Sequence, residues 1–151
     1  MIGMVLITHG RLAEELKSAM EHVVGPQQSV ATVCIGPDDD MEVRRGDIRA
    51  RIADVDQGDG VVLLTDMLGG TPSNLSMEMV QAGRALDVIA GVNLPLLVKL
   101  ARIRGSEPLA EAVDHAEAAG RKYIASASSM RAGTAPCSIS GANGAVKDTR
   151  P

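Results

Sequence analysis

The chain has 151 residues, 45% of them hydrophobic, and a formal net charge of −4 at neutral pH. This length suits one domain with a full hydrophobic core, which must be aliphatic because the sequence has one Tyr and neither Phe nor Trp. The negative charge and the lack of stacking rings argue against nucleic acid and anionic membrane surfaces as partners.

The cysteines and the N-terminal segment do not indicate an exported or membrane protein. Cys34 lies in an apolar run and Cys137 in a polar one, so the two have no metal or redox spacing. The apolar run at the N-terminus is too short for a signal peptide and has no basic flank before it. No segment approaches the length of a membrane span. We therefore expect a cytoplasmic protein without direct membrane insertion.

Apolar runs and helical spacings alternate through the first half of the chain. The first run predicts a strand that is buried on both faces and ends at His9, and the spacing after it predicts a helix that a Gly-Pro pair ends. Three aspartates at 38–40 can cap a further helix, although such a group could also ligate a cation. The expected elements, in order, are a strand at 2–8, a helix at 11–24, a strand at 29–35, a helix at 41–55 and a strand at 61–64.

The stretch VVLLTDMLGGTPSN, at 61–74, carries the strongest local pattern. Its strand stops where Asp66 replaces the apolar side chains, and a turn with two glycines leads into a helix that is expected to continue to residue 82. We interpret Thr71 as the N-cap of this helix and Pro72 as its first residue. Free N–H groups there, beside glycines that permit close backbone approach, would form an anion site. The alternative is a plain strand-to-helix turn in which Asp66 is a local cap.

The remaining elements follow the same alternation, with glycine or proline at their ends. Ser106 is the expected N-cap of the last helix and Gly120 its end. We interpret Lys99, Arg102 and Arg104 as a solvated basic face, which could instead dock an acidic partner. The expected elements are a strand at 86–91, a helix at 96–102, a helix at 109–119 and a short fifth strand at 122–125.

The composition changes at residue 127. From 127 to 151 small and polar residues dominate, and such a segment cannot bury enough apolar surface to offset the entropy of ordering it. We therefore predict one folded domain at 1–126 and a disordered low-complexity tail at 127–151.

Alternating strands and helices predict an α/β fold with a mainly parallel sheet and right-handed crossovers. Ligands of such sheets bind beyond the carboxyl ends of the strands. His9 and Asp66 each follow the end of an apolar strand. If the first and third strands are neighbours, as in the order 2-1-3-4-5, these two side chains lie side by side and form one site.

A histidine beside a carboxylate has one ring nitrogen held as a donor, which leaves the other as a nucleophile or base. The Gly69-Gly70-Thr71 turn would add a cradle for phosphate. The sequence has no Walker lysine pattern, no GxSxG elbow and no metal-ligand cluster. We therefore predict that His9 is itself phosphorylated, with no cofactor and no metal, and that His22 and His115 are surface residues.

Three motifs carry a family resemblance: ITHG, LTDMLGGTPSN and GVNLPLLVKL. In this order and spacing they resemble the mannose-family enzyme IIA of the bacterial phosphoenolpyruvate-dependent phosphotransferase system, over about residues 1–126. The resemblance implies a three-layer, flavodoxin-like sheet of order 2-1-3-4, with the short fifth strand at its edge. Members of the family are commonly dimers that exchange the last strand, so the resemblance also implies a homodimer.

The resemblance assigns roles to the motif residues. It implies a phosphotransferase in which His9 accepts a phosphoryl group from the histidine-containing phosphocarrier protein and passes it to an enzyme IIB. Asp66 would orient His9, and Thr71 would lie at the phosphoryl position. The phosphoryl-binding turn would be completed by Gly69, Gly70 and Ser73.

Two other functions stay open at this point. A free-standing enzyme IIA could be a regulatory phosphorelay protein without sugar transport. It could also be the phosphoryl-donor subunit of a dihydroxyacetone kinase, whose domain has a similar histidine. The GVNLP segment and the Gly69-Gly70-Thr71-Pro72 turn favour the mannose type.

Overall fold

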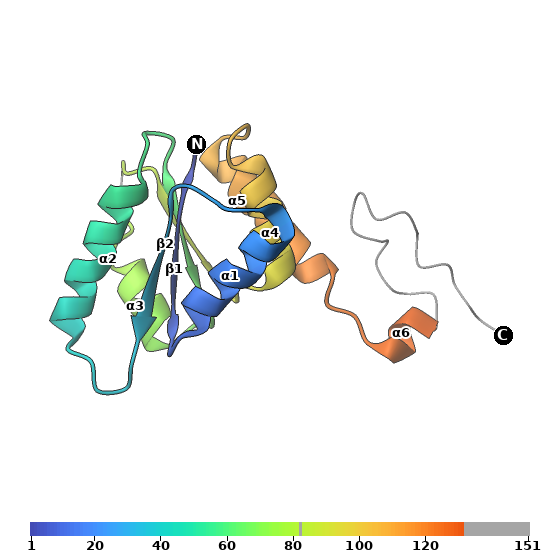
Figure 1. The fold of residues 1–151 in the computed structure, drawn as a ribbon, viewed down its shortest axis with the longest axis horizontal. Helices are drawn as coiled ribbons and strands as arrows, with labels where there is room; N and C mark the ends of the chain where they lie inside the picture. The colour runs from blue at the N-terminus through green and yellow to red at the C-terminus, as the bar shows by residue number, and fades with distance from the viewer. Residues whose placement is uncertain (82, 132–151) are drawn as a thin grey trace.

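Four parallel strands form the centre of the computed structural model, which describes residues 1–81 and 83–131 (Figure 1). The strand order is β2-β1-β3-β4, and each neighbouring pair is parallel. This confirms the predicted α/β class and the order of the first four strands. The strands are β1 (Gly3–His9), β2 (Val30–Ile35), β3 (Val61–Thr65) and β4 (Leu86–Ala90).

Helices cover both faces of the sheet, so the fold has three layers (Figure 1). One face packs an aliphatic core against α1, α4 and α5, and the other packs a second core against α2 and α3. No helix in the ranges 1–81 and 83–131 has the length and hydropathy that crossing a bilayer requires. The helices are α1 (Leu12–Val24), α2 (Met41–Val55), α3 (Thr71–Met77), α4 (Leu94–Ile103), α5 (Leu109–Lys122) and α6 (Ala127–Arg131).

β1 is the strand that positions the candidate site. Its first six residues are buried, and alternate side chains enter the two cores. Ile7 lies opposite Thr65, the last residue of β3. β1 therefore extends two residues beyond its neighbour and presents His9 at the carboxyl edge of the sheet.

The boundaries of α3 differ from the prediction. Gly70 is the N-cap, so Thr71 is the first helical residue and Pro72 the second. The helix ends at Met77, and Glu78 is its C-cap. The N–H groups of Met79 and Val80 then bond to carbonyls only three residues back, in tighter turns that bury Met79. The end predicted at residue 82 lies outside the described residues.

The boundaries of α5 also differ from the prediction. Pro108 is its N-cap, and Ser106 instead donates from Oγ to the carbonyl of Ile103 at 3.2 Å. Gly120 does not end the helix, because it is a position where α5 packs closely on α4. A Cβ there would lie 3.1 Å from Cδ1 of Leu96. This glycine serves helix packing, and α5 continues past it.

The fifth strand predicted at 122–125 is absent from the described part of the chain. Its first residue ends α5, and Ile124 is 76% exposed with no strand beside it. Residues 127–131 of the predicted tail form α6, which has no buried side chain. The rest of the predicted tail, 132–151, lies outside the described residues.

Arg104 follows α4 and is buried, which corrects its predicted place on a solvated basic face. The residue is 2% exposed. Nη1 donates to the carbonyls of Ile2 at 3.1 Å and Ser29 at 3.3 Å, and Nη2 donates to the carbonyl of Gln28 at 2.5 Å and to Oε1 of Gln27 at 3.0 Å. Burial lowers the pKa of the guanidinium, which is nevertheless charged at neutral pH. Arg104 therefore ties the starts of β1 and β2 to the end of α4.

Arg104→Met is expected to lower the free energy of unfolding by about 2–4 kcal/mol, because it removes a charged donor from the buried carbonyl of Ile2 and from the carbonyl of Gln28. Urea denaturation followed by circular dichroism measures this change. Arg102→Met, on the exposed face of the same helix, is the matched control and should change stability by no more than about 0.5 kcal/mol. Equal effects of the two substitutions would contradict the role assigned to Arg104.

Candidate functional site

His9 and Asp66 are in contact at the carboxyl edge of the sheet. Nδ1 of His9 lies 2.8 Å from Oδ2 of Asp66, and the backbone N–H of His9 donates to the same oxygen at 3.0 Å. An ionised carboxylate only accepts hydrogen bonds, so Nδ1 carries the proton. The lone pair of Nε2 is therefore available on a side chain that is 50% exposed.

The Asp66 carboxylate is held through both oxygens. Oδ1 accepts from the backbone N–H of Met67 at 3.0 Å, and only 13% of the Asp66 side chain is exposed. Partial burial disfavours the ionised form, but the hydrogen bonds from the ring and backbone of His9 outweigh it and lower the pKa of Asp66. Because this pKa is lower in the folded chain than in the unfolded one, the interaction stabilises the fold above the ordinary carboxyl pKa. This stabilisation is lost as the pH falls through the lowered value.

The backbone at Gly70 approaches the free edge of the His9 ring. A Cβ at this position would lie 2.8 Å from Cε1 and 3.3 Å from Nε2 of His9. Within the described part of the chain, the N–H groups of Gly70 and Thr71 make no hydrogen bond. The turn therefore presents two unused donors next to the nitrogen with the free lone pair.

Ser73 shapes this turn from inside. It is buried, and its Oγ accepts from the N–H of Gly69 at 3.0 Å and donates to the carbonyl of Gly70 at 3.2 Å. Gly69 has a φ of 82°, in the left-handed region that favours glycine. Because the one hydroxyl proton of Ser73 is used within the turn, this residue supports the turn. Thr71, in contrast, is exposed on the surface of the turn.

Thr8 is a residue of the site that the sequence did not reveal. Its buried Oγ1 accepts from the N–H of Ala13 at 2.7 Å. Thr8 therefore fixes the start of α1 from the position next to His9. Arg11 occupies the N-cap position without a side-chain hydrogen bond. The available signal was a hydroxyl residue shortly before a helix start. An N-cap side chain, however, accepts from an N–H two or three residues later, whereas Thr8 accepts from an N–H five residues later.

Met67 and Leu68 form an apolar border on the turn. They are 56% and 78% exposed and follow Asp66 directly. Two large apolar side chains within a glycine-rich turn were the signal for this feature, because such turns are usually polar.

The other predicted candidates lie elsewhere. His22 is exposed on α1, and His115 on α5 has its Nδ1 2.6 Å from Oε2 of Glu107. Asp40 caps α2 by accepting from the N–H of Glu42 at 2.9 Å. The described residues hold no group of three or more His, Cys, Asp or Glu arranged to bind a metal ion. Cys137 lies outside the described residues.

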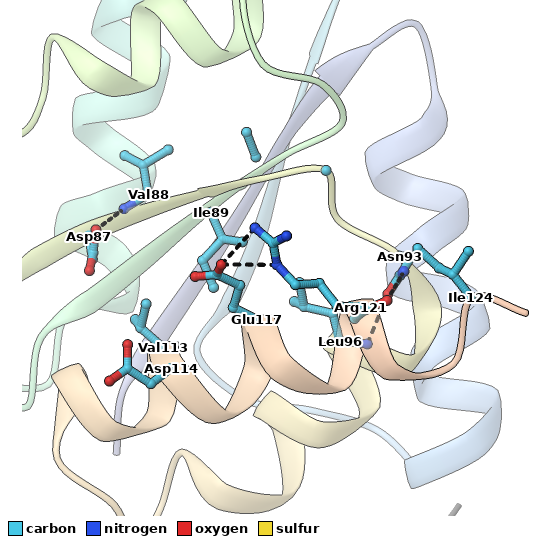
Figure 2. A pocket seen from close by; sticks show the side chains of 13 residues that line it. Asp87, Val88, Ile89, Asn93, Leu96, Val113, Asp114, Glu117, Arg121 and Ile124 are labelled. Carbon is cyan, nitrogen blue, oxygen red and sulfur yellow. Dashed lines mark hydrogen bonds and ion pairs between the residues drawn. The ribbon is translucent and has the colours of Figure 1, made fainter. Parts of the chain in front are cut away.

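A hollow of about 430 Å³ lies beside β4 and α5 (Figure 2). Figure 2 shows Glu117 and Arg121 of α5 paired in this hollow, with a closest distance of 2.9 Å. None of the predicted site residues lines it. The hollow is therefore distinct from the edge that holds His9.

Under the sequence-based prediction that His9 is phosphorylated, Gly70→Ala is expected to slow the labelling of His9 by roughly 10–100-fold, because the new methyl group must displace either the turn or a ring that Asp66 holds. The rate can be followed by rapid-quench labelling. Gly46→Ala is the matched control, since Gly46 lies in α2 with open space around its Cα. A Gly70→Ala rate equal to that of the control would show that the close approach is unimportant.

Known proteins similar in sequence to this chain include components of one transport system. Residues 3–117 match the EIIA-man family model, described as PTS system fructose IIA component. The chain is 35% identical over 107 residues to the "PTS system mannose-specific EIIAB component" of Escherichia coli K12, an alignment that covers 71% of this chain and 33% of that protein. It is 27% identical over 111 residues to the "PTS system sorbose-specific EIIA component" of Lacticaseibacillus casei, covering 74% and 80% of the two chains. The chain therefore spans about a third of the E. coli relative and most of the L. casei one.

Solved structures show the same fold. A phosphotransferase system component EIIA from Streptococcus agalactiae superposes with a TM-score of 0.78 at 23% identity, covering 85% of this chain and 99% of that one. A mannose/sorbose specific IIA subunit from Enterococcus faecalis gives a TM-score of 0.74 at 25% identity, with coverage of 83% and 93%. The match to the family model extends over most of the chain and includes His9, Asp66 and the glycine turn. The chain therefore belongs to the mannose-type IIA components of the phosphotransferase system.

Proposed function

We propose that the chain is a phosphohistidine carrier in sugar phosphotransfer. His9 accepts a phosphoryl group from the histidine-containing phosphocarrier protein and passes it to a histidine of an enzyme IIB. The observation that carries this proposal is the 2.8 Å contact between Nδ1 of His9 and Asp66, which leaves Nε2 free on a half-exposed ring. The mannose- and sorbose-specific names of two relatives support a role in sugar phosphotransfer.

In the proposed transfer, Nε2 of His9 attacks the phosphorus of the donor phosphohistidine in line. The Nε2–P bond forms as the P–N bond to the donor ring breaks, and the electron pair of the broken bond returns to the donor ring. Nδ1 keeps its proton throughout. Transfer to the enzyme IIB repeats these events with His9 as the donor. Neither transfer step consumes water or a cofactor.

Asp66 is proposed to act in two ways. Its hydrogen bond fixes the tautomer of His9, so that the free lone pair is on the exposed nitrogen. When phosphorus bonds to Nε2 and Nδ1 keeps its proton, positive charge develops on the ring, and an adjacent carboxylate stabilises that charge. The lowered pKa of Asp66 supports this role, because the group is then ionised at neutral pH.

The glycine turn is proposed to receive the phosphoryl oxygens. The unused N–H groups of Gly70 and Thr71 are donors of the kind that stabilise phosphoryl oxygens, and the Thr71 hydroxyl could add a third. Gly69 and Ser73 would support the turn through their mutual hydrogen bond at 3.0 Å.

Reconstitution tests the proposal. The full chain is incubated with labelled phosphoenolpyruvate, enzyme I and the phosphocarrier protein, and each component is omitted in turn. We expect acid-labile label on the chain only when all three are present, followed by its loss on addition of a mannose-type enzyme IIB. Absence of label would contradict the carrier function. Label that no enzyme IIB removes would favour a regulatory protein without sugar transport.

We also propose that the phosphotransfer domain comprises residues 1–126 and forms a homodimer. Every buried apolar residue of the described chain lies before residue 117, which supports this boundary. Within the described chain β4 pairs only with β3, and unpaired strand edges are commonly covered by a partner chain. The hollow in Figure 2 runs beside this edge and is bordered by the exposed Ile124.

Light scattering at micromolar concentration is expected to give twice the chain mass of 15.7 kDa. Ile124→Asp should shift the mass toward the monomer, because it places a charge where the partner would pack. Val23→Asp is the matched control, since Val23 is an exposed apolar residue of α1 on another part of the surface. A wild-type mass of one chain would contradict the dimer.

A further inference from the structure

A separate pocket of about 310 Å³ opens between α4 and α5. Most of its lining comes from side chains on the helix faces that do not pack against the sheet. Its size is at the lower end of the range for small-molecule sites, roughly 300–1,000 Å³. The residues that line it are Val98, Lys99, Arg102, Ile103, His115, Ala118, Lys122 and Tyr123.

Positive charge collects in this pocket. Lys99, Arg102 and Lys122 line it, and no carboxylate does. Within the described residues none of these three side chains has an ion pair with Asp or Glu, although other surface arginines such as Arg44 and Arg121 do. On a chain with a net charge of −4, three uncompensated cations at one hollow indicate a site for a multiply charged anion.

The pocket also holds the one aromatic side chain of the whole sequence, Tyr123. Nζ of Lys122 lies 5.6 Å from the centre of its ring, a cation–π distance that helps to orient the ring. Val98 and Ala118 add apolar surface from the two helices. The lining therefore combines cations with an aromatic and aliphatic surface.

We propose that this pocket binds a nucleoside di- or triphosphate. The base would pack on Tyr123 and the apolar side chains, and the phosphates would lie against the cations from both helices. A sugar phosphate or inorganic phosphate would use the cations but leave the aromatic surface unused. The pocket shares no residue with the His9 site, and the proposal does not depend on the carrier function.

Calorimetric titration of the full chain tests the proposal with three probes: ATP, ADP and inorganic tripolyphosphate. ATP and ADP are expected to bind, with affinity that falls as salt is raised. Tripolyphosphate should bind at least about fivefold more weakly than ATP, because it carries the charge without the base. His9→Ala is expected to bind ATP like the wild type, which separates this site from the carrier function.

Variants separate the contribution of the cations to ATP binding from that of the Tyr123 ring. Lys99→Gln combined with Arg102→Gln should raise the Kd for ATP roughly tenfold or more. Tyr123→Leu should raise the Kd for ATP about fivefold or more and leave that for tripolyphosphate unchanged. Arg84→Gln is the matched control, because Arg84 is an exposed cation next to β4 and away from the pocket.

Three results would overturn the proposal. The first is the absence of ATP binding at millimolar concentration and low salt. The second is an equal loss of binding in the Arg84→Gln control, which would indicate general attraction to the surface. The third is competition by a hexaglutamate peptide as strong as that by ADP, which would make the pocket a docking point for an acidic polypeptide.

Discussion

His9→Ala is expected to abolish phosphorylation by the phosphocarrier protein. The ring nitrogen that would take phosphorus is removed, and the alanine side chain offers no nucleophile. The sequence has only two other histidines, His22 and His115. Both are exposed on helices, and neither lies beside the glycine turn. Labelling from phosphoenolpyruvate through enzyme I and the phosphocarrier protein should therefore fall to background.

His22→Ala and His115→Ala are the controls for this experiment. Each should accept label at the wild-type rate and to the wild-type extent. Circular dichroism of His9→Ala should match the wild type, since half of the His9 side chain is exposed and contributes little to the core. Stoichiometric label on His9→Ala, or its loss from either control, would refute the assignment of His9.

Asp66→Asn is expected to slow phosphoryl transfer by roughly 10²–10⁴-fold, the range for a positioned proton partner. The amide keeps the size of the carboxylate but has no charge to stabilise the phosphorylated ring. It can also present its NH₂ group to Nδ1, which would favour the tautomer with the proton on Nε2. Single-turnover transfer from the phosphocarrier protein, measured by rapid quench, gives the rate.

Asp40→Asn is the matched control for Asp66→Asn. It makes the same chemical change at the N-cap of α2, where an asparagine caps about as well as an aspartate. Its transfer rate should equal that of the wild type. If Asp66→Asn transferred phosphate within a factor of about three of the wild type, the carboxylate would have no part in the reaction.

The location of the candidate site could be predicted from the sequence because it depends on long-range regularities. Strands buried on both faces are continuous apolar runs, so the polar residues that end them are conspicuous. Parallel connections then bring the carboxyl ends of β1 and β3 to one edge. His9 and Asp66 could therefore be paired before any distance was known, on the condition that the first and third strands are neighbours, and the family resemblance supplied the strand order that meets this condition.

Features set by a single contact could not be predicted in this way. A glycine near the end of a helical pattern commonly ends the helix, yet Gly120 is present because Leu96 packs on it. Arg104 shares its sequence pattern with the exposed Lys99 and Arg102, and only the carbonyls gathered around it explain its burial. Local propensity contains neither contact, so the predicted helix end was wrong, and the predicted basic face was wrong at Arg104 while Lys99 and Arg102 are exposed as predicted.

Residues that support the site were hidden for a similar reason. Ser73 bonds back to the turn that precedes it, and Thr8 bonds forward to the start of α1. Both hydroxyls act on backbone groups whose positions the tertiary fold determines. A sequence pattern shows that such residues are near the site, but it does not show whether they contact a ligand or hold the loop.

The central claim is that the phosphoryl group bonds to Nε2 of His9 while Asp66 holds Nδ1. Its most direct test is ¹⁵N and ³¹P NMR of the phosphorylated chain, with histidine labelled on both ring nitrogens, which identifies the nitrogen bonded to phosphorus. The predicted result is one phosphohistidine, at His9, with phosphorus on Nε2 and a proton retained on Nδ1. Phosphorus on Nδ1, or on any other histidine, would contradict the account.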